Sequence, residues 1–143
     1  MRPSPVFVDT SGWCALQSAH DRYAELAQAI WGTILRDGRP LVTTSFVVGE
    51  TFTALRSRET FELAWGAVER IRRVRTLRVD RPSPELEQTA FSILGTYREH
   101  RFSFVDAVSF ATMNALGIRD SFAFDKHFAI AGFVRLGVDA PLG

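Results

Sequence analysis

Residues 6–11 read VFVDTS, an apolar run that stops at an acidic residue and continues into two hydroxyl side chains. Consecutive β-branched and aromatic residues predict a short buried strand over Val6–Val8. Asp9 then stands at the carboxyl end of that strand. The next residues can begin a helix, with Ser11 as the expected cap and Trp13 on its apolar face. A strand that passes straight into a helix is typical of α/β folds.

The same plan repeats along the rest of the chain, where short apolar runs alternate with longer segments of helical period. Further strands are expected at residues 41–44, 76–79, 121–124 and 133–136. Strands separated by helices indicate parallel pairing in a sheet that is covered on both faces. The sequence therefore predicts the α/β class, as a three-layer α/β/α domain with a mainly parallel sheet of about five strands.

Cap residues mark the expected helix ends. Ser45, Thr60 and Ser103 each precede a segment of helical period and are the expected N-caps. Gly117 follows the last apolar residue of its segment and is expected to close that helix.

The composition is that of a globular chain. A length of 143 residues fits one domain, so residues 1–143 are expected to fold as a single unit. The formal net charge of +1 excludes a strongly basic protein that coats nucleic acid. Cys14 is the sole cysteine, so an internal disulfide is impossible and a thiolate-rich zinc site does not fit.

The sequence shows no targeting or membrane segment. Residues 1–5 (MRPSP) pass straight into the first expected strand, without the apolar stretch of a signal peptide. No uncharged apolar run approaches the roughly 20 residues that span a bilayer. These features predict a soluble protein of the reducing cytoplasm, with no membrane partner.

Four acidic residues stand at comparable places in this plan. Asp9 and Asp125 follow the first and fourth expected strands. Glu50 lies about two turns into the helix after the second strand, and Asp106 begins the helix that leads to the fourth. Sites in open α/β sheets form beyond the carboxyl ends of the strands, and clustered carboxylates need a cation such as Mg²⁺ or Mn²⁺. The pattern predicts a metal site, although periodicity leaves the path of residues 85–100 open.

Three of these acids also have a structural explanation. Asp106 stands three residues after Ser103, which is the spacing of a capping box. Asp125 can cap the turn that follows it, and Asp9 can end its strand in an Asx turn. Glu50 has no such explanation, because an unpaired carboxylate on a largely apolar helix is costly. Convergence explains all four acids together, whereas capping explains three.

The segments around these acids resemble one protein family. They are Asp9-Thr10-Ser11, Glu50 in its apolar helix, residues 106–118 (DAVSFATMNALGI) and residues 123–128 (AFDKHF). Over nearly the whole chain they are similar to PIN-domain ribonucleases, particularly the VapC-type toxins of bacterial toxin–antitoxin pairs. Relatives often carry Thr or Ser two positions before the last acid, where this chain has Ala123. That hydroxyl is missing here, while all four carboxylates are present.

The resemblance implies a metal-dependent endoribonuclease held in check by a cognate VapB-type antitoxin. Thr10 or Ser11 would orient a metal-bound water, and that water would attack an RNA phosphodiester in line, without a side-chain nucleophile. Relatives of this type also imply a homodimer and an antitoxin tail whose arginine reaches the acidic site. The residues implied to bind one or two Mg²⁺ or Mn²⁺ ions and to carry catalysis are Asp9, Glu50, Asp106 and Asp125.

Two other hypotheses remain open. A catalytically silent PIN-like module would keep the fold only to hold RNA or a protein, although retaining four costly carboxylates argues against it. A phosphoryl-transfer enzyme of aspartate type, such as a haloacid-dehalogenase-like phosphatase or a receiver domain, would use Asp9 as its nucleophile or phosphoacceptor. The chain lacks the second aspartate of such phosphatases, because residue 11 is Ser, and it lacks the adjacent acid pair of receivers.

Other prominent residues have plainer interpretations. The arginines between residues 70 and 81 form the densest basic stretch, and an exposed helix end is favoured over an RNA-binding track. The three tryptophans lie among apolar residues, which is typical of core or dimer-interface positions. His127 lies close to Asp125, but a surface or structural role is favoured and it is left outside the predicted site.

Overall fold

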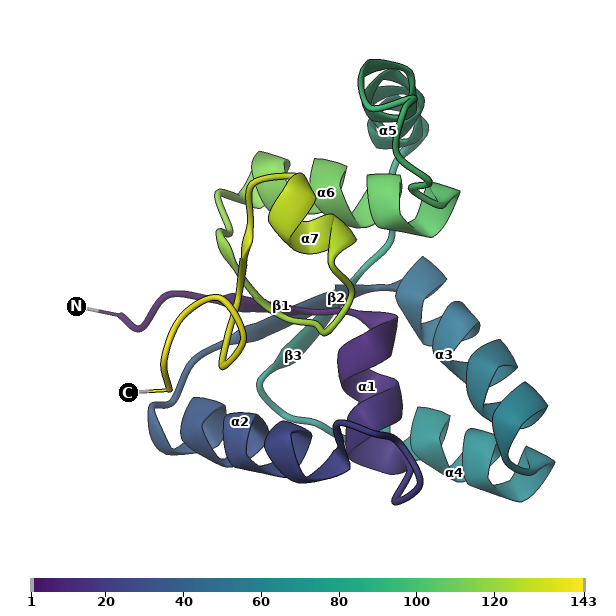
Figure 1. Cartoon of the computed structure of the whole chain (residues 1–143), viewed down its shortest axis with the longest axis vertical. Coiled ribbons are helices and arrows are strands. Elements are labelled where there is room, and N and C mark those ends of the chain that lie inside the picture. The colour runs from purple at the N-terminus through teal and green to yellow at the C-terminus, as the bar shows by residue number, and fades with distance from the viewer. Residues whose placement is uncertain (1, 143) are drawn as a thin grey trace.

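The computed structural model describes residues 2–142, which form seven helices and five strands (Figure 1). In chain order the elements are β1 (Val6–Val8), α1 (Thr10–Gln17), α2 (Ala24–Arg36), β2 (Leu41–Thr44), α3 (Ser45–Arg58), α4 (Phe61–Arg72), β3 (Leu77–Asp80), α5 (Pro84–Thr96), α6 (Phe104–Leu116), β4 (Asp120–Phe122), α7 (His127–Ile130) and β5 (Val134–Arg135). All five predicted strands are present, with small shifts at their ends. Within residues 2–142, no helix combines the length and apolar character needed to cross a membrane.

The strands form one parallel sheet in the order β3-β2-β1-β4-β5, which confirms the predicted fold class. β1 is central, since Phe7 pairs with Val42 on one side and with Ser121 on the other. The chain builds one half of the sheet outward from β1 and then returns to the other side of β1. Sites in such sheets form where the strand order reverses, here beyond the carboxyl ends of β1 and β4.

Helices cover both faces of this sheet, as the predicted three layers require. In Figure 1, α1, α2 and α4 lie on one side of the strands, and α6 and α7 lie on the other. Ile30 of α2 and Phe110 of α6 belong to the same apolar core as β1. Val6–Val8 is fully buried, because both faces of β1 are packed. This explains why the strand reads as a continuous apolar run rather than an alternating one.

Two helices begin earlier than predicted, directly at the end of the preceding strand. The cap of α1 is Asp9 rather than Ser11, and the Asp9 side chain accepts a hydrogen bond from the Ser11 N–H. The cap of α3 is Thr44 rather than Ser45. Both predicted caps were wrong because an N-cap residue is itself extended, so the last residue of a strand (Thr44) or the residue directly after it (Asp9) can serve without a loop. These short junctions fix the directions of α1 and α3 relative to the sheet.

The segment between β3 and α6 settles the path that periodicity left open. α5 lies on the outer side of α6 (Figure 1), where Ala90 is buried against it. The predicted Ser103 cap begins α6, and Gly117 closes it with a φ of 68°, which favours glycine. α6 therefore starts near the carboxyl ends of the strands, with Asp106 in its first turn.

β4 is shorter than predicted, because the chain leaves the sheet after Phe122 and contacts α1 instead. The N–H of Phe124 donates to the Ser11 hydroxyl at 2.9 Å. Gly12 faces the same segment so closely that a Cβ there would lie 2.3 Å from the Phe122 carbonyl oxygen. This contact brings the residue that follows, Asp125, to the end of β1.

Candidate metal centre

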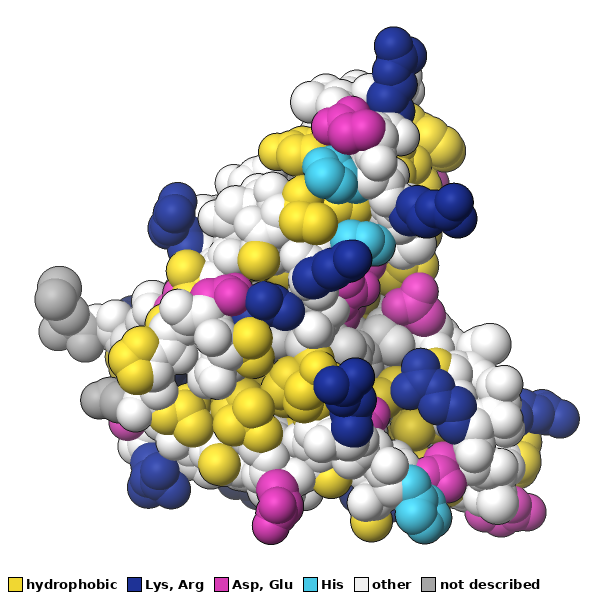
Figure 2. All heavy atoms as spheres, in the orientation of Figure 1, with side chains coloured by type: hydrophobic (Ala, Val, Ile, Leu, Met, Phe, Trp, Pro, Cys, Tyr) yellow, Lys and Arg dark blue, Asp and Glu magenta, His cyan; other side chains and the backbone are white. Residues whose placement is uncertain are grey.

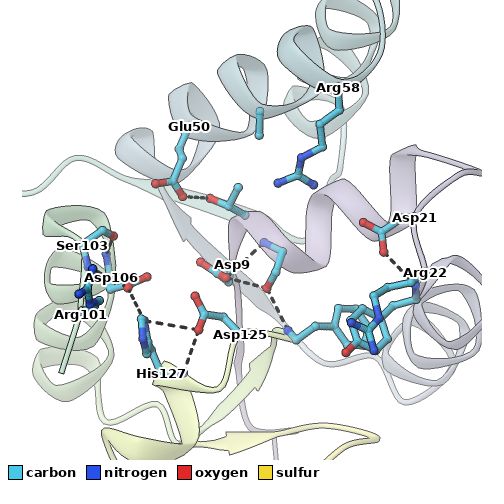
Figure 3. A pocket seen from close by; sticks show the side chains of 15 residues that line it. Asp9, Asp21, Arg22, Glu50, Arg58, Arg101, Ser103, Asp106, Asp125 and His127 are labelled. Carbon is cyan, nitrogen blue, oxygen red and sulfur yellow. Dashed lines mark hydrogen bonds and ion pairs between the residues drawn. The ribbon is translucent and has the colours of Figure 1, made fainter.

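An open pocket of about 660 Å³ lies beyond the carboxyl ends of β1 and β4 (Figure 3). The four predicted acids come from the end of β1, from α3, from the first turn of α6 and from the loop after β4. The structure brings them to one place, as the sequence predicted. The four predicted acids that line the pocket are Asp9, Glu50, Asp106 and Asp125, and Asp21 lines it as well.

Asp9 is the most deeply buried of these acids, with 3% of its surface exposed. Its Oδ2 accepts hydrogen bonds from the Ser11 N–H at 3.2 Å and from the Ser11 hydroxyl at 2.7 Å. Ser11 therefore binds Asp9 on one side and the Phe124 N–H on the other. One serine fixes the carboxylate and ties the β4 exit to α1.

Glu50 is held by the neighbouring residue, Thr10. The Thr10 hydroxyl donates to Glu50 Oε1 and so joins the first turn of α1 to α3. The hydroxyl protons of Thr10 and Ser11 are thus both donated to carboxylates. The predicted role of either hydroxyl in orienting a water stays a prediction.

Asp106 has both of the roles considered for it. Its Oδ2 accepts from the Ser103 N–H at 3.0 Å, while its own N–H donates to the Ser103 hydroxyl, which completes the capping box. The same Oδ2 lies 3.0 Å from His127 Nδ1. A residue that caps α6 is therefore also a wall of the pocket, so the structural and functional interpretations do not exclude each other.

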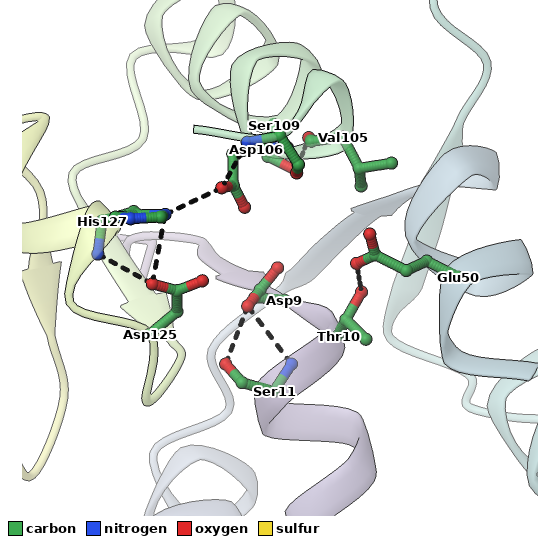
Figure 4. Close-up of polar contacts among 10 residues, drawn as sticks. Asp9, Thr10, Ser11, Glu50, Val105, Asp106, Ser109, Asp125 and His127 are labelled. Atoms are coloured by element: carbon green, nitrogen blue, oxygen red, sulfur yellow. Dashed lines mark hydrogen bonds and ion pairs between the residues drawn. The ribbon is translucent and has the colours of Figure 1, made fainter. Parts of the chain in front are cut away.

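Asp125 occupies the loop between β4 and α7. Its Oδ1 accepts from the backbone N–H of His127 at 2.9 Å. Figure 4 shows Asp9, Asp106 and Asp125 pointing toward one another, with Glu50 on the Thr10 side of the group. Side-chain atoms of Asp106, Asp125 and His127 all lie within 4.8 Å of one another, so the three residues form one tight group.

The four acids share one pattern of hydrogen bonding. In each, one oxygen accepts from a neighbouring residue, and the other accepts no hydrogen bond from residues 2–142. A carboxylate oxygen without a protein donor is available to accept a hydrogen bond from water or to bind a cation. The oxygens in this state are Asp9 Oδ1, Glu50 Oε2, Asp106 Oδ1 and Asp125 Oδ2.

The electrostatics of the pocket also favour a cation. Burial is the main cause that raises the pKa of Asp9 to about 7; the Ser11 hydrogen bond opposes it and the Asp106 charge adds to it. Burial likewise raises the pKa of Glu50, against the Thr10 hydrogen bond. No arginine or lysine of residues 2–142 forms an ion pair with any of the four acids. Oxygen ligands with uncompensated negative charge fit Mg²⁺ or Mn²⁺.

The sequence favours a position for His127 outside the site, whereas the structure places it in the pocket. Its side chain is 18% exposed and lies within 3.5 Å of both Asp106 and Asp125. The only signal in the sequence was its position two residues after Asp125. That spacing alone does not distinguish an inward from an outward side chain.

The basic residues at the pocket are not those of the arginine-rich stretch at residues 70–81. Arg22, Arg58 and Arg101 line it, and each comes from the end of an element or from a turn. Figure 2 shows dark-blue side chains around the hollow in which acidic side chains are visible. The pocket therefore combines an acidic floor with a basic rim.

The structure also shows where Ala123 and the three tryptophans lie. Ala123 is buried in the apolar core, so the hydroxyls that reach the carboxylates come from Thr10 and Ser11 alone among residues 2–142. Trp13 is in the core and Trp31 packs against it, whereas Trp65 is 55% exposed.

Comparisons with known proteins agree with this architecture. The PIN domain family model matches residues 6–134. VapC20 of Mycobacterium tuberculosis, described as a 23S rRNA-specific endonuclease in strains CDC 1551 and H37Rv, is 40% identical over 132 residues, which cover 92% of this chain and 97% of VapC20.

A solved structure gives the same result. The crystal structure of Mycobacterium tuberculosis VapC20, described as a sarcin-ricin loop cleaving toxin, matches with a TM-score of 0.81 and 38% identity. The match covers 90% of this chain and 96% of that one. Sequence, fold and the converging acids lead to one conclusion: the chain belongs to the PIN domain family and resembles its VapC members over nearly its whole length.

Proposed function

We propose that this chain is a VapC-type toxin, an endoribonuclease that hydrolyses RNA phosphodiester bonds with Mg²⁺ or Mn²⁺. One observation carries the proposal: four carboxylates from separate elements meet, and each has one oxygen fixed and one oxygen with no donor among residues 2–142. Similarity to VapC20 supports RNA as the substrate. We assign Asp9, Glu50, Asp106 and Asp125 as the metal-binding and catalytic residues.

The chain's own residues would prepare the site before RNA binds. Thr10 and Ser11 hold two of the carboxylates, and the Ser103 cap holds a third, so their free oxygens keep fixed positions. Such preorganisation avoids reorganisation during the reaction. A bound Mg²⁺ or Mn²⁺ would supply Lewis-acid activation of water and stabilisation of the departing oxygen. No side-chain nucleophile is required.

The rim offers contacts for the RNA backbone. Arg22, Arg58 and Arg101 surround an acidic floor, so phosphates could be held beside the carboxylates without touching them. The Arg22 guanidinium lies over the Tyr23 ring at 4.8 Å, and Tyr23 stacks on Phe124 at 4.5 Å. These planar groups at the pocket wall suit an unpaired base.

Similarity to VapC20 supports a proposal for the substrate and the partners. VapC20 is named for cleavage of 23S rRNA and of the sarcin-ricin loop, so the same loop is the first substrate to test. We further propose a VapB-type antitoxin as the partner that restrains the activity, and a homodimer as the assembly. Exposed apolar side chains such as Phe91 (62%) and Trp65 (55%) are compatible with protein partners.

The decisive experiment is cleavage of a 23S rRNA fragment by purified protein. Cutting is expected with Mg²⁺ or Mn²⁺, and none with EDTA. Asp9→Asn and Asp106→Asn are expected to abolish it, because each removes a charged ligand. Glu62→Gln, an exposed acid on α4, is the matched control and should cut normally.

Two results would contradict the proposal. Unchanged cutting by both aspartate variants would show that another site is responsible. A folded wild-type protein that binds no Mn²⁺ in calorimetry and cuts no RNA would favour the catalytically silent binding module.

A further inference from the structure

His127 contacts two of the proposed metal-binding acids at once. Its Nδ1 lies 3.0 Å from Asp106 Oδ2 and 3.5 Å from Asp125 Oδ1. Both neighbours are carboxylate oxygens, which accept hydrogen bonds, so Nδ1 carries a proton and donates. The backbone N–H of His127 adds a second donor to Asp125 Oδ1 at 2.9 Å.

The imidazole ring is held in this direction by packing as well. Phe102 lies 5.0 Å from it between ring centroids, and Phe102 in turn stacks on His100 and meets Phe110 edge-on. The His127 side chain is 18% exposed. A ring packed this way keeps its Nδ1 pointed at the acids without needing a ligand to hold it.

The two acids need such a link because they come from different elements. Asp106 belongs to the first turn of α6, and Asp125 belongs to the loop between β4 and α7. Two carboxylates side by side repel each other, and His127 offsets that repulsion with a donor to each, its Nδ1 to Asp106 and its backbone N–H to Asp125. His127 binds Asp106 Oδ2 and Asp125 Oδ1 (Figure 4), whereas Asp106 Oδ1 and Asp125 Oδ2 accept no hydrogen bond from the described residues 2–142.

We propose that His127 is a positioning residue that sets the spacing of Asp106 and Asp125 for the cation, and is not itself a ligand. The proposal rests on the metal site of the proposed function. Partners that orient metal ligands typically contribute about 10- to 100-fold to metal affinity. That effect should appear in metal binding alone, without RNA.

Two variants separate the hydrogen bond from the packing. His127→Phe keeps a ring beside Phe102 but has no donor, and is expected to raise the Kd for Mn²⁺ about 10- to 100-fold in calorimetry. His127→Asn places an amide N–H at the δ position and should recover most of the affinity. Thermal unfolding of the metal-free variants tests whether the loss of affinity is merely a loss of folding.

Pulsed EPR of Mn²⁺ bound to the wild-type protein tests the same point without a variant. The expected spectrum lacks the strong nitrogen coupling of a directly bonded imidazole. Strong coupling, or wild-type affinity in His127→Phe, overturns the positioning role while leaving the four-acid site intact. Absence of Mn²⁺ binding by the folded wild-type protein overturns the metal site itself, and the positioning role with it.

Discussion

The hydroxyl of Thr10 donates a hydrogen bond to Glu50, a residue 40 positions further along the chain. Thr10 is the first residue of α1, and Glu50 lies within α3. The next residue, Ser11, makes the equivalent contact to Asp9. Two consecutive hydroxyls therefore hold two of the four acids, so the first turn of α1 fixes the positions of half of the carboxylates in the pocket.

Thr10→Val removes the hydroxyl and keeps the shape of the side chain. Glu50 then loses its donor, so we expect the Kd for Mn²⁺ to rise about tenfold and RNA cleavage to fall accordingly. Calorimetry and a cleavage assay measure the two effects. Thr10→Ser keeps the hydroxyl and serves as the control; equal affinities in Thr10→Val and the wild type would show that this bond does not position Glu50.

Asp9→Asn should stabilise the metal-free protein at high pH while abolishing activity. The folded-state pKa of Asp9, about 7, lies above its ordinary value of 3.8, so the folded protein prefers the protonated acid. The protonated Asp9 of the wild type therefore contributes about 4 kcal/mol to the free energy of unfolding below about pH 4. This contribution is lost as the pH rises through 7.

The measurement is urea unfolding of both proteins in EDTA. The difference in unfolding free energy between variant and wild type should grow from pH 4.5 to pH 8, and added Mn²⁺ should reverse its sign at pH 8. A difference that does not change with pH would argue against a destabilising Asp9 charge.

Arg58→Gln tests the basic rim. Arg58 is exposed at the pocket, and loss of one phosphate contact should raise KM and lower the salt slope of RNA binding by about 0.7. Mn²⁺ affinity should not weaken, because removing a nearby positive charge cannot disfavour a cation. Arg36→Gln, an exposed arginine of α2 away from the pocket, should leave both quantities unchanged; an equal change in the two variants would rule out a specific contact.

Gly12→Ala tests the contact between α1 and the end of β4. The new Cβ would lie 2.3 Å from the Phe122 carbonyl oxygen, which also accepts from the Asp9 N–H. We expect a loss of about 1–3 kcal/mol in unfolding free energy, together with weaker metal binding.

Gly95→Ala in α5 is the matched control, because its Cβ would meet nothing within 4 Å. Alanine is the better helix former, so this variant should gain about 0.5–1 kcal/mol. Chemical denaturation compares the two variants, and equal stability would mean that α1 moves freely to accept the methyl group.

The fold and the convergence of the acids could be predicted because both depend on local pattern. A buried parallel strand reads as an apolar run, and a residue at its carboxyl end must share an edge of the sheet with the others. The strand order could not be obtained in this way. Only the structure shows that β4 pairs with β1 and so brings Asp125 beside Asp9.

The sequence pattern did not predict which residues outside the regular helices and strands line the pocket. Arg22 lies between α1 and α2, and Arg101 lies between α5 and α6, where no period indicates which way a side chain faces. His127 was missed because it begins α7, and a helix of four residues is too short for a period to show which way a side chain faces. The caps at Asp9 and Thr44 were missed because the sequence does not show whether a loop separates a strand from its helix.

The capping box of α6 links the assembly of the site to the folding of the chain. Asp106 Oδ2 accepts a hydrogen bond from the Ser103 N–H and so closes the first turn of α6. The other carboxylate oxygen, Oδ1, then faces the pocket. A chain that has formed this turn has already placed one of the four proposed catalytic acids. Under the proposed function, the folded chain would need no rearrangement of this turn to present Asp106 to a metal ion.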